Sequence, residues 1–108
     1  MPVIGEVTKQ RDGSYKGELH TMTIRAPLEF RPNRSKTKGE PDFRVFSNSL
    51  EIGSARSSEP GAKGRYISVS IALPEFGRRP VRADLVPAGK RRVSVVYSLC
   101  WQPEEQSQ

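Results

Sequence analysis

The feature that most constrains the fold is an alternation of apolar and polar side chains with a period of two. In residues 66–73 a large apolar side chain occupies every second position, with serine or alanine between them, and residues 93–99 repeat the pattern. A period of two is typical of a β-strand with one buried face. No stretch longer than about two turns has the 3.6-residue periodicity of a helix. The sequence therefore predicts an all-β protein.

Turn signals divide the rest of the chain into further strands. Asp12-Gly13 is a dipeptide favoured in hairpin turns, and residues 47–49 also join two short apolar runs. The strands expected around these turns and later in the chain cover residues 3–9, 15–24, 43–46, 50–55 and 81–85.

Two of these strands carry irregularities. In residues 15–24 the apolar parity changes after Leu19, so we expect one strand with a bulge or bend near His20. Residues 81–85 are few and follow Pro80, which is typical of an edge strand. On the strand at 93–99, Val96 and the neighbouring Cys100 predict partial burial of the second face as well.

A chain of 108 residues has the usual size of one domain. We expect a small single-domain antiparallel meander over residues 1–101, either closed into a barrel or folded into a small sandwich. Polar, proline- or glycine-containing segments at 31–41, 57–64 and 76–80 would interrupt the meander. Residues 102–108 are polar and are expected to form a disordered tail.

Composition argues against catalysis. The chain has one His and one Cys, with no metal-ligand spacing, no phosphate-binding glycine loop and no nucleophile motif. His20 could act as a general base for a nucleophile, but no Ser or Cys nucleophile motif accompanies it. We therefore expect a non-enzymatic protein without cofactor or metal. The start carries no signal-peptide pattern and no apolar run could span a membrane, so a cytoplasmic location without membrane contact is expected.

Several short blocks occur in an order that is similar to a known family. They are Ile4-Gly5, residues 12–17, Pro41-Asp42-Phe43-Arg44-Val45-Phe46, Glu51-Ile52-Gly53-Ser54-Ala55 and Tyr66-Ile67-Ser68-Val69. From about Ile4 to Val86 the chain resembles the bacterial domain-of-unknown-function family 736. The resemblance implies a small protein encoded near conjugative or other mobile elements and assigns no activity. The chain departs from the family at Arg56, where a Trp is expected, and at residues 72–76, where Asp residues tend to precede Pro and Phe.

Positive charge points to binding. Eighteen Lys and Arg against twelve Asp and Glu give a net charge of +6. The first dense segment holds Arg31, Arg34, Lys36 and Lys38 with no acidic residue. Such side chains neutralise phosphates and release counterions from nucleic acid. A solvated basic loop that maintains solubility is the alternative, and both interpretations stay open.

The second dense segment lies between residues 76 and 92, where Asp84 is the single acid opposing the positive charges. Arginine can fork onto phosphates or stack on bases. For Arg82 we favour the alternative that a charge protects an edge strand from aggregation. The remaining candidates in this segment are Arg78, Arg79, Lys90, Arg91 and Arg92.

An aromatic residue accompanies the basic ones. Arg44 and Phe46 are two residues apart and share one strand face, opposite Phe43 and Val45. An exposed arginine beside an exposed ring could hold a nucleobase. Ordinary packing with a cation–π contact is the alternative.

Two functions follow from these patterns. The first is a nucleic-acid-binding accessory protein of a mobile element, which contacts DNA or RNA through the basic segments with little sequence reading. The second is a protein-interaction module, either a homodimer or a factor that docks on another protein, which would use exposed sheet edges.

Overall fold

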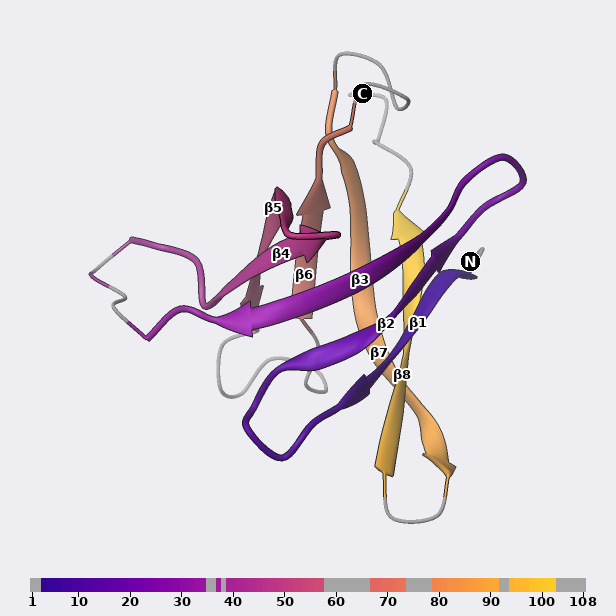
Figure 1. Cartoon of the computed structure of the whole chain (residues 1–108), viewed down its shortest axis with the longest axis horizontal. Coiled ribbons are helices and arrows are strands. Elements are labelled where there is room, and N and C mark those ends of the chain that lie inside the picture. Colours follow the sequence, from indigo (N-terminus) through magenta and orange to yellow (C-terminus); the bar gives the residue numbers. More distant parts are fainter. Residues whose placement is uncertain are drawn as a thin grey trace.

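The computed structural model describes residues 3–34, 37, 39–57, 67–73, 79–91 and 94–102, without the side chains of residues 90, 91, 94 and 102. Within these ranges every regular element is a strand. Each strand pairs antiparallel with the next, and the last pairs with the first, so the sheet is a closed barrel (Figure 1). The strands are β1 (Val3–Lys9), β2 (Tyr15–His20), β3 (Arg25–Pro32), β4 (Phe43–Ser47), β5 (Leu50–Ser57), β6 (Ile67–Ile71), β7 (Val81–Arg91) and β8 (Ser94–Gln102).

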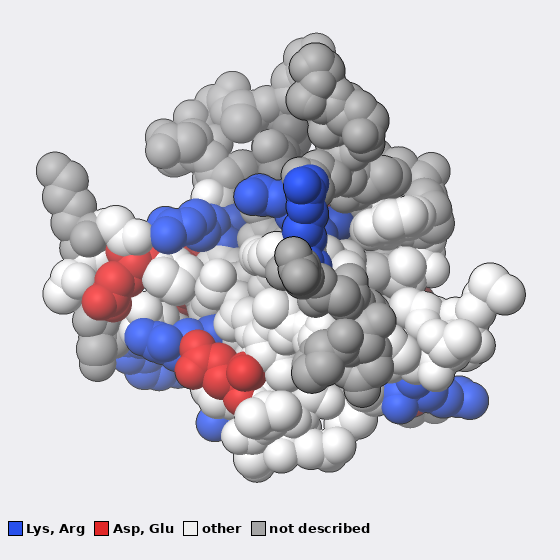
Figure 2. Space-filling view, turned by 90° about the horizontal axis from the view of Figure 1, so that it is seen from above, with Lys and Arg blue, Asp and Glu red and all other residues white. Residues whose placement is uncertain are grey.

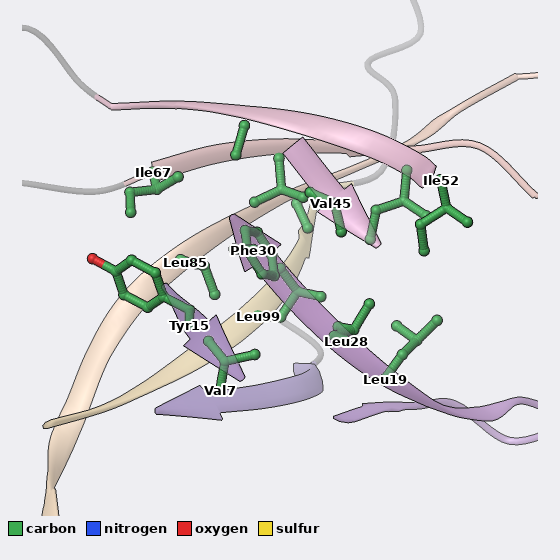
Figure 3. Packing of buried hydrophobic residues seen from close by; sticks show 14 residues of the cluster. Val7, Tyr15, Leu19, Leu28, Phe30, Val45, Ile52, Ile67, Leu85 and Leu99 are labelled. Atoms are coloured by element: carbon green, nitrogen blue, oxygen red, sulfur yellow. The ribbon is translucent and has the colours of Figure 1, made fainter. Parts of the chain in front are cut away.

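The all-β prediction is confirmed, and of its two alternatives the barrel is the one adopted. Alternate residues of each strand point inward and form one apolar core (Figure 3). All eight strands contribute to that core, because a closed sheet has a single interior. The most deeply buried large side chains are Phe30, Leu19, Ile71, Leu85, Leu99, Val7 and Val45.

Closure of the barrel depends on positions where the backbones of neighbouring strands approach each other very closely. A Cβ atom on Gly17 would collide with the backbone carbonyl of Glu6, and one on Gly53 would collide with that of Ser70. Beside Gly53 the pairing of β4 with β5 shifts by one residue, and the extra residue, Ile52, is buried. Glycines and bulges of this kind bend strands sharply, which is how a sheet curls into a barrel.

The predicted strand at residues 15–24 is wrong in its second half. β2 ends at His20, and residues 21–24 form a hairpin turn that leads into β3. In this turn Thr21 donates its N–H to the carbonyl of Ile24, and its Oγ1 accepts the N–H groups of Thr23 and Ile24. A threonine side chain that bonds to the following backbone favours a turn, so the parity change marks a reversal of the chain.

β3 itself is not among the predicted strands, since its two prolines argue against a strand. The barrel accommodates them through the stagger of its neighbours. Pro27 pairs only with Glu18 of β2, and Pro32 pairs only with Phe43 of β4. Each proline therefore lies where β3 has a partner on one side, so the missing N–H need not interrupt a ladder on both sides.

β7 is not the short edge strand that was predicted. It extends to Arg91 and pairs with β6 on one side and β8 on the other. Pro87 again lies beyond the β6 pairing, which ends at Leu85. The continuation was missed because Pro87 and Gly89 resemble a turn, whereas they form an irregularity in a long β7–β8 ribbon.

The ends of the predicted elements agree in most other places. The β1–β2 hairpin turns through residues 10–14, and the β4–β5 turn has positive φ angles of 52° at Asn48 and 71° at Ser49, as in a type I′ hairpin. Val96 is buried and Cys100 is half-buried, which confirms partial burial of the second face of β8. Gln102 is the last residue of β8, so the tail does not begin there; residues 103–108 lie outside the described part.

An aromatic cluster lies at one end of the core. The Tyr15 ring makes edge contacts with Phe30, Phe43 and Tyr97 at centroid distances of 6.3, 5.5 and 5.3 Å. Burial raises the pKa of the Tyr15 hydroxyl to about 12, with smaller contributions from the charge of Tyr97 and a hydrogen bond with it. Figure 3 shows this hydroxyl pointing away from the other labelled core side chains.

Candidate nucleic-acid interface

A row of arginine and serine side chains crosses the outer wall of the barrel. Arg31 of β3 pairs with Arg44 of β4, which pairs with Ser54 of β5. Ser54 pairs with Ser70 of β6, and Ser70 pairs with Arg82 of β7. All five alternate with inward-facing residues, so they face outward. We call these five residues the arginine row.

The dimensions of the arginine row suit an extended chain of anions. Strands of a sheet are roughly 4.8 Å apart, so the row is roughly 19 Å long when it is followed along the curved wall of the barrel. Because it runs from β3 to β7 of an eight-stranded barrel, its two ends face different directions. Small serine side chains occupy the middle, with arginines at both ends. On this convex surface the two serines place hydroxyl groups between the arginines of β3 and β4 and the arginine of β7.

Two of the three arginines have acidic neighbours. Arg31 lies 3.1 Å from a carboxylate oxygen of Glu29, and Arg44 lies 3.1 Å from one of Glu51. All four side chains are partly exposed, and such surface ion pairs contribute only about 0–1 kcal/mol. Glu29 and Glu51 therefore orient the two guanidinium groups. Because each ion pair is weak, little free energy is needed for a phosphate to replace the carboxylate.

Arg82 differs from the other two. It is exposed, and no ion pair engages it within the described part of the chain. The edge-protection interpretation of Arg82 is wrong, because β7 has partners on both sides. The closed barrel instead carries Arg82 to the far end of the row that begins at Arg31.

Phe46 lies on the same strand face as Arg44, as predicted, and the structure makes this the outer face, since Val45 between them is buried. Its cation–π partner, however, is Arg31 of the neighbouring strand, whose guanidinium carbon lies 4.2 Å from the ring centroid. Arg44 instead pairs with Glu51. The sequence predicted the shared face of Arg44 and Phe46, but the contact with Arg31 depends on the β3–β4 register.

A hollow of about 310 Å³ adjoins Phe46. It lies where Lys16, Glu29 and Phe46 follow one another across β2, β3 and β4. We call it the Phe46 hollow. Its lining consists of Lys16, Gly17, Pro27, Leu28, Glu29, Phe46, Asn48 and Ser49.

The first basic segment is tied to the barrel by hydrogen bonds. Arg31 belongs to β3 and not to a loop, and Arg34 donates to the carbonyl of Asp12 at 2.9 Å. Arg56, at the position where the family resemblance leads us to expect Trp, donates to the carbonyls of Gly39 and Glu40. Lys36 and Lys38 lie outside the described residues.

Two carboxylates near this segment have lowered pKa values: Glu40 before β4, and Asp12 in the turn between β1 and β2. Hydrogen bonds from Asn33 and then Thr37 lower the pKa of Glu40. Hydrogen bonds from Ser14 lower the pKa of Asp12, and the charges of Lys16 and Arg34 act in the same direction. Glu40 follows the basic segment by two residues in the sequence, whereas Asp12 is distant in sequence and lies beside Arg34 only through the fold.

The second basic segment does not form one site. Arg79 is exposed and lies just before β7, whereas Lys90 and Arg91 end that strand. At roughly 3.3 Å per residue, the ten steps of β7 separate its ends by roughly 33 Å. Arg78 and Arg92 lie outside the described residues. The structure therefore places Arg31 directly beside Arg44, aligns Arg82 with them at three strand pairings from Arg44, and places Lys90 and Arg91 elsewhere.

Charge is also distributed in several groups on the rest of the surface. Figure 2 shows one face, on which Lys and Arg side chains form separate groups, some with Asp or Glu beside them. His20 is exposed on β2. Within the described ranges, no three His, Cys, Asp or Glu side chains gather as metal ligands, and no helix is long and apolar enough to cross a membrane.

Sequence reasoning missed Ser54, Ser70 and Lys16 as candidate residues. Both serines belong to strands that the sequence predicted, but their alignment with the arginines depends on four strand pairings. In the sequence Lys16 is an isolated lysine, and only the β2–β3 pairing shows that it lies beside Glu29.

Comparison with known proteins gives one match. A family model described as "Protein of unknown function (DUF736)" matches residues 3–104. No curated protein and no solved structure matches the chain. The family resemblance seen in the sequence is thus confirmed over nearly the whole chain.

Proposed function

The chain belongs to the family of proteins of unknown function DUF736, and from its surface chemistry we propose that it binds nucleic acid without catalysis. The observation that carries the proposal is the arginine row. Its ligand would be the phosphate backbone, with little base reading, as suits a cytoplasmic accessory protein of a mobile element. The cations and hydroxyls of the described surface support binding of a polyanion.

Electrostatics within the row support this proposal. Arg31 and Arg44 are directly opposite each other, and like charges in that position destabilise a strand pair. A phosphate between them would offset the repulsion and accept hydrogen bonds from both guanidinium groups. The hydroxyls of Ser54 and Ser70 would donate to the next phosphate, and Arg82 would hold the one beyond it.

The proposal is tested by removing the charge of the row. Labelled single-stranded DNA, duplex DNA and RNA are titrated by fluorescence anisotropy at several salt concentrations with the native protein and with an Arg31→Gln, Arg44→Gln, Arg82→Gln variant. Each phosphate contact contributes roughly 0.7 to the slope of log affinity against log salt for single strands. Loss of three contacts should reduce that slope by about 2.

A matched control removes the same charge elsewhere. Lys9, Arg11 and Arg25 are exposed and lie outside the row, so replacing all three by Gln changes the net charge equally. If both triple variants lose the same affinity, binding follows overall charge and the row is not the site. If the native protein binds none of the nucleic acids at low salt, the proposal is wrong.

Self-association is a second candidate function, and one observation favours it. At one end of the barrel an apolar depression of about 360 Å³ is surrounded by partly exposed side chains, among which Met22 is fully exposed. Exposed apolar surfaces frequently mark interfaces. The exposed sheet edges that the sequence led us to expect for this function are not found between β1 and β8, because these two strands pair and close the barrel. The depression is lined by Ile4, Thr21, Met22, Thr23, Ile24, Val81 and Trp101.

Sedimentation equilibrium distinguishes this second candidate. A homodimer through the apolar depression should dissociate when Met22 is replaced by Ser, because a polar side chain would then be buried in the interface. A native protein that sediments as a monomer at all concentrations excludes self-association.

A further inference from the structure

The Phe46 hollow is chemically distinct from the arginine row beside it. The aromatic ring of Phe46 and the ring of Pro27 provide apolar surface, while Lys16, Glu29 and Asn48 place polar groups at the border. Small-ligand sites usually combine a mainly apolar lining with a few polar groups, and start at about 300 Å³. The hollow meets both conditions at the lower limit of size, which suits one flat heterocycle.

Arg31 connects the hollow to the row. Its guanidinium lies over the Phe46 ring and is bonded to Glu29, so one side chain borders both places. Along β4, Phe46 and Arg44 are two residues apart, which is roughly 7 Å on one strand face. That is about the separation between the base of a nucleotide and its phosphate group.

We propose that the Phe46 hollow receives an unpaired nucleobase while the adjoining phosphates lie on the arginine row, so that the ligand is a single strand. This inference rests on the proposed function and adds the kind of nucleic acid. Arg31 covers one side of the Phe46 ring and does not line the hollow, so the base would stack on the part of the ring that faces the hollow. Such stacking is tolerant of base identity because every base has a π-face. The polar groups of Glu29 and Asn48 then hydrogen-bond the edge of the base.

The shape of the molecule also disfavours a paired base. The hollow lies on the outer wall of a barrel whose extents are 35, 31 and 28 Å. The major groove of duplex DNA is about 12 Å wide, which admits a helix or a two-stranded ribbon but not a whole barrel. A base within a duplex has both faces covered by its neighbours and is out of reach of a surface hollow unless it leaves the stack.

The test separates the base from the phosphates. A labelled single-stranded oligonucleotide is compared with one of the same length that carries abasic sites, and therefore the same phosphates, by fluorescence anisotropy with the native chain. The intact strand should bind about tenfold more tightly, in line with the contribution of one stacked base. An intact RNA strand and a blunt duplex are titrated in parallel to identify the preferred sugar and to confirm preference for an unpaired strand.

The variant Phe46→Leu removes the ring and keeps an apolar side chain. It should bind the intact strand with the affinity of the abasic one, and bind the abasic strand within about twofold of the native protein. Val86→Ala is the control at an exposed apolar site that lines neither the hollow nor the apolar depression, and it should retain the tenfold preference. Thermal unfolding confirms that each variant is folded.

The outcomes of this test are distinguishable from those of the proposed function. Equal affinity of the native protein for intact and abasic strands, with a salt slope that depends on the row, overturns the base site and leaves the row in place. Tighter binding of the duplex than of the single strand also overturns it. Failure to bind either strand at low salt overturns the proposed function and this inference with it.

Discussion

The guanidinium carbon of Arg31 lies 4.2 Å from the centroid of the Phe46 ring, across the pairing of β3 with β4. This contact fixes the position of a long, flexible side chain at the junction of the arginine row and the Phe46 hollow. A ring beneath a guanidinium contributes about 0.5–1 kcal/mol at an exposed site. Arg31 is thereby held ready for a ligand, which lowers the entropy lost when it binds.

Among the residues of the arginine row, Arg82 should give the loss of binding affinity that is simplest to interpret when it is replaced. Since no ion pair engages it within the described part of the chain, Arg82→Gln removes a cation without leaving an unpaired glutamate. We expect weaker binding to all sequences and a salt slope for single strands reduced by about 0.7, measured by anisotropy titrations. Arg25→Gln is the single-charge control, and an equal slope change in both variants would contradict a specific role for Arg82.

Gly17 should tolerate no side chain. A Cβ atom there would collide with the carbonyl oxygen of Glu6 and with the Cα atom of Val7, both of which belong to the backbone of β1. Because backbone cannot rotate away, Gly17→Ala should cost about 1–3 kcal/mol in the free energy of unfolding. Urea denaturation measures the loss. Lys16→Ala, at the exposed neighbouring position, should change stability by less than about 0.5 kcal/mol.

Tyr15 should make stability fall at alkaline pH. Its pKa is raised from 10.0 to about 12 in the folded protein, chiefly by burial. The stabilising contribution is therefore complete below pH 10 and is lost as the pH rises from 10 to about 12. Denaturation at a series of pH values should show a shallower alkaline decline in Tyr15→Phe than in the native protein. Identical declines would show that Tyr15 does not titrate in this way.

Glu40 should contribute in the opposite direction at acid pH. Hydrogen bonds from Asn33 and Thr37 lower its pKa from the ordinary value of 4.5. Its contribution to stability is present above pH 4.5 and is lost as the pH falls through the lower folded value. Asn33→Ala removes the largest cause, so the carboxyl resonance of Glu40 should titrate at higher pH in an NMR experiment. An unchanged titration midpoint would contradict the proposed cause.

The sequence by itself determined the fold class and the identity of most strands. Period-two alternation places large apolar side chains on one face, and the burial of Ile67, Val69 and Ile71 follows from it directly. The shared face of Arg44 and Phe46 was also predictable, because side chains two residues apart lie on one face of a strand. These properties are local, so they can be derived from neighbouring residues.

Only the tertiary structure decided barrel closure and the composition of the candidate site. β3 contradicts the usual exclusion of proline from strands, and it is possible because staggered neighbours leave Pro27 and Pro32 paired on one side. Arg31 and Arg82 lie on strands that are far apart in the chain, and they share a row only through the intervening pairings of β4, β5 and β6. Strand register is a long-range property set by the whole closed sheet, which is why the sequence could nominate the charges but not align them.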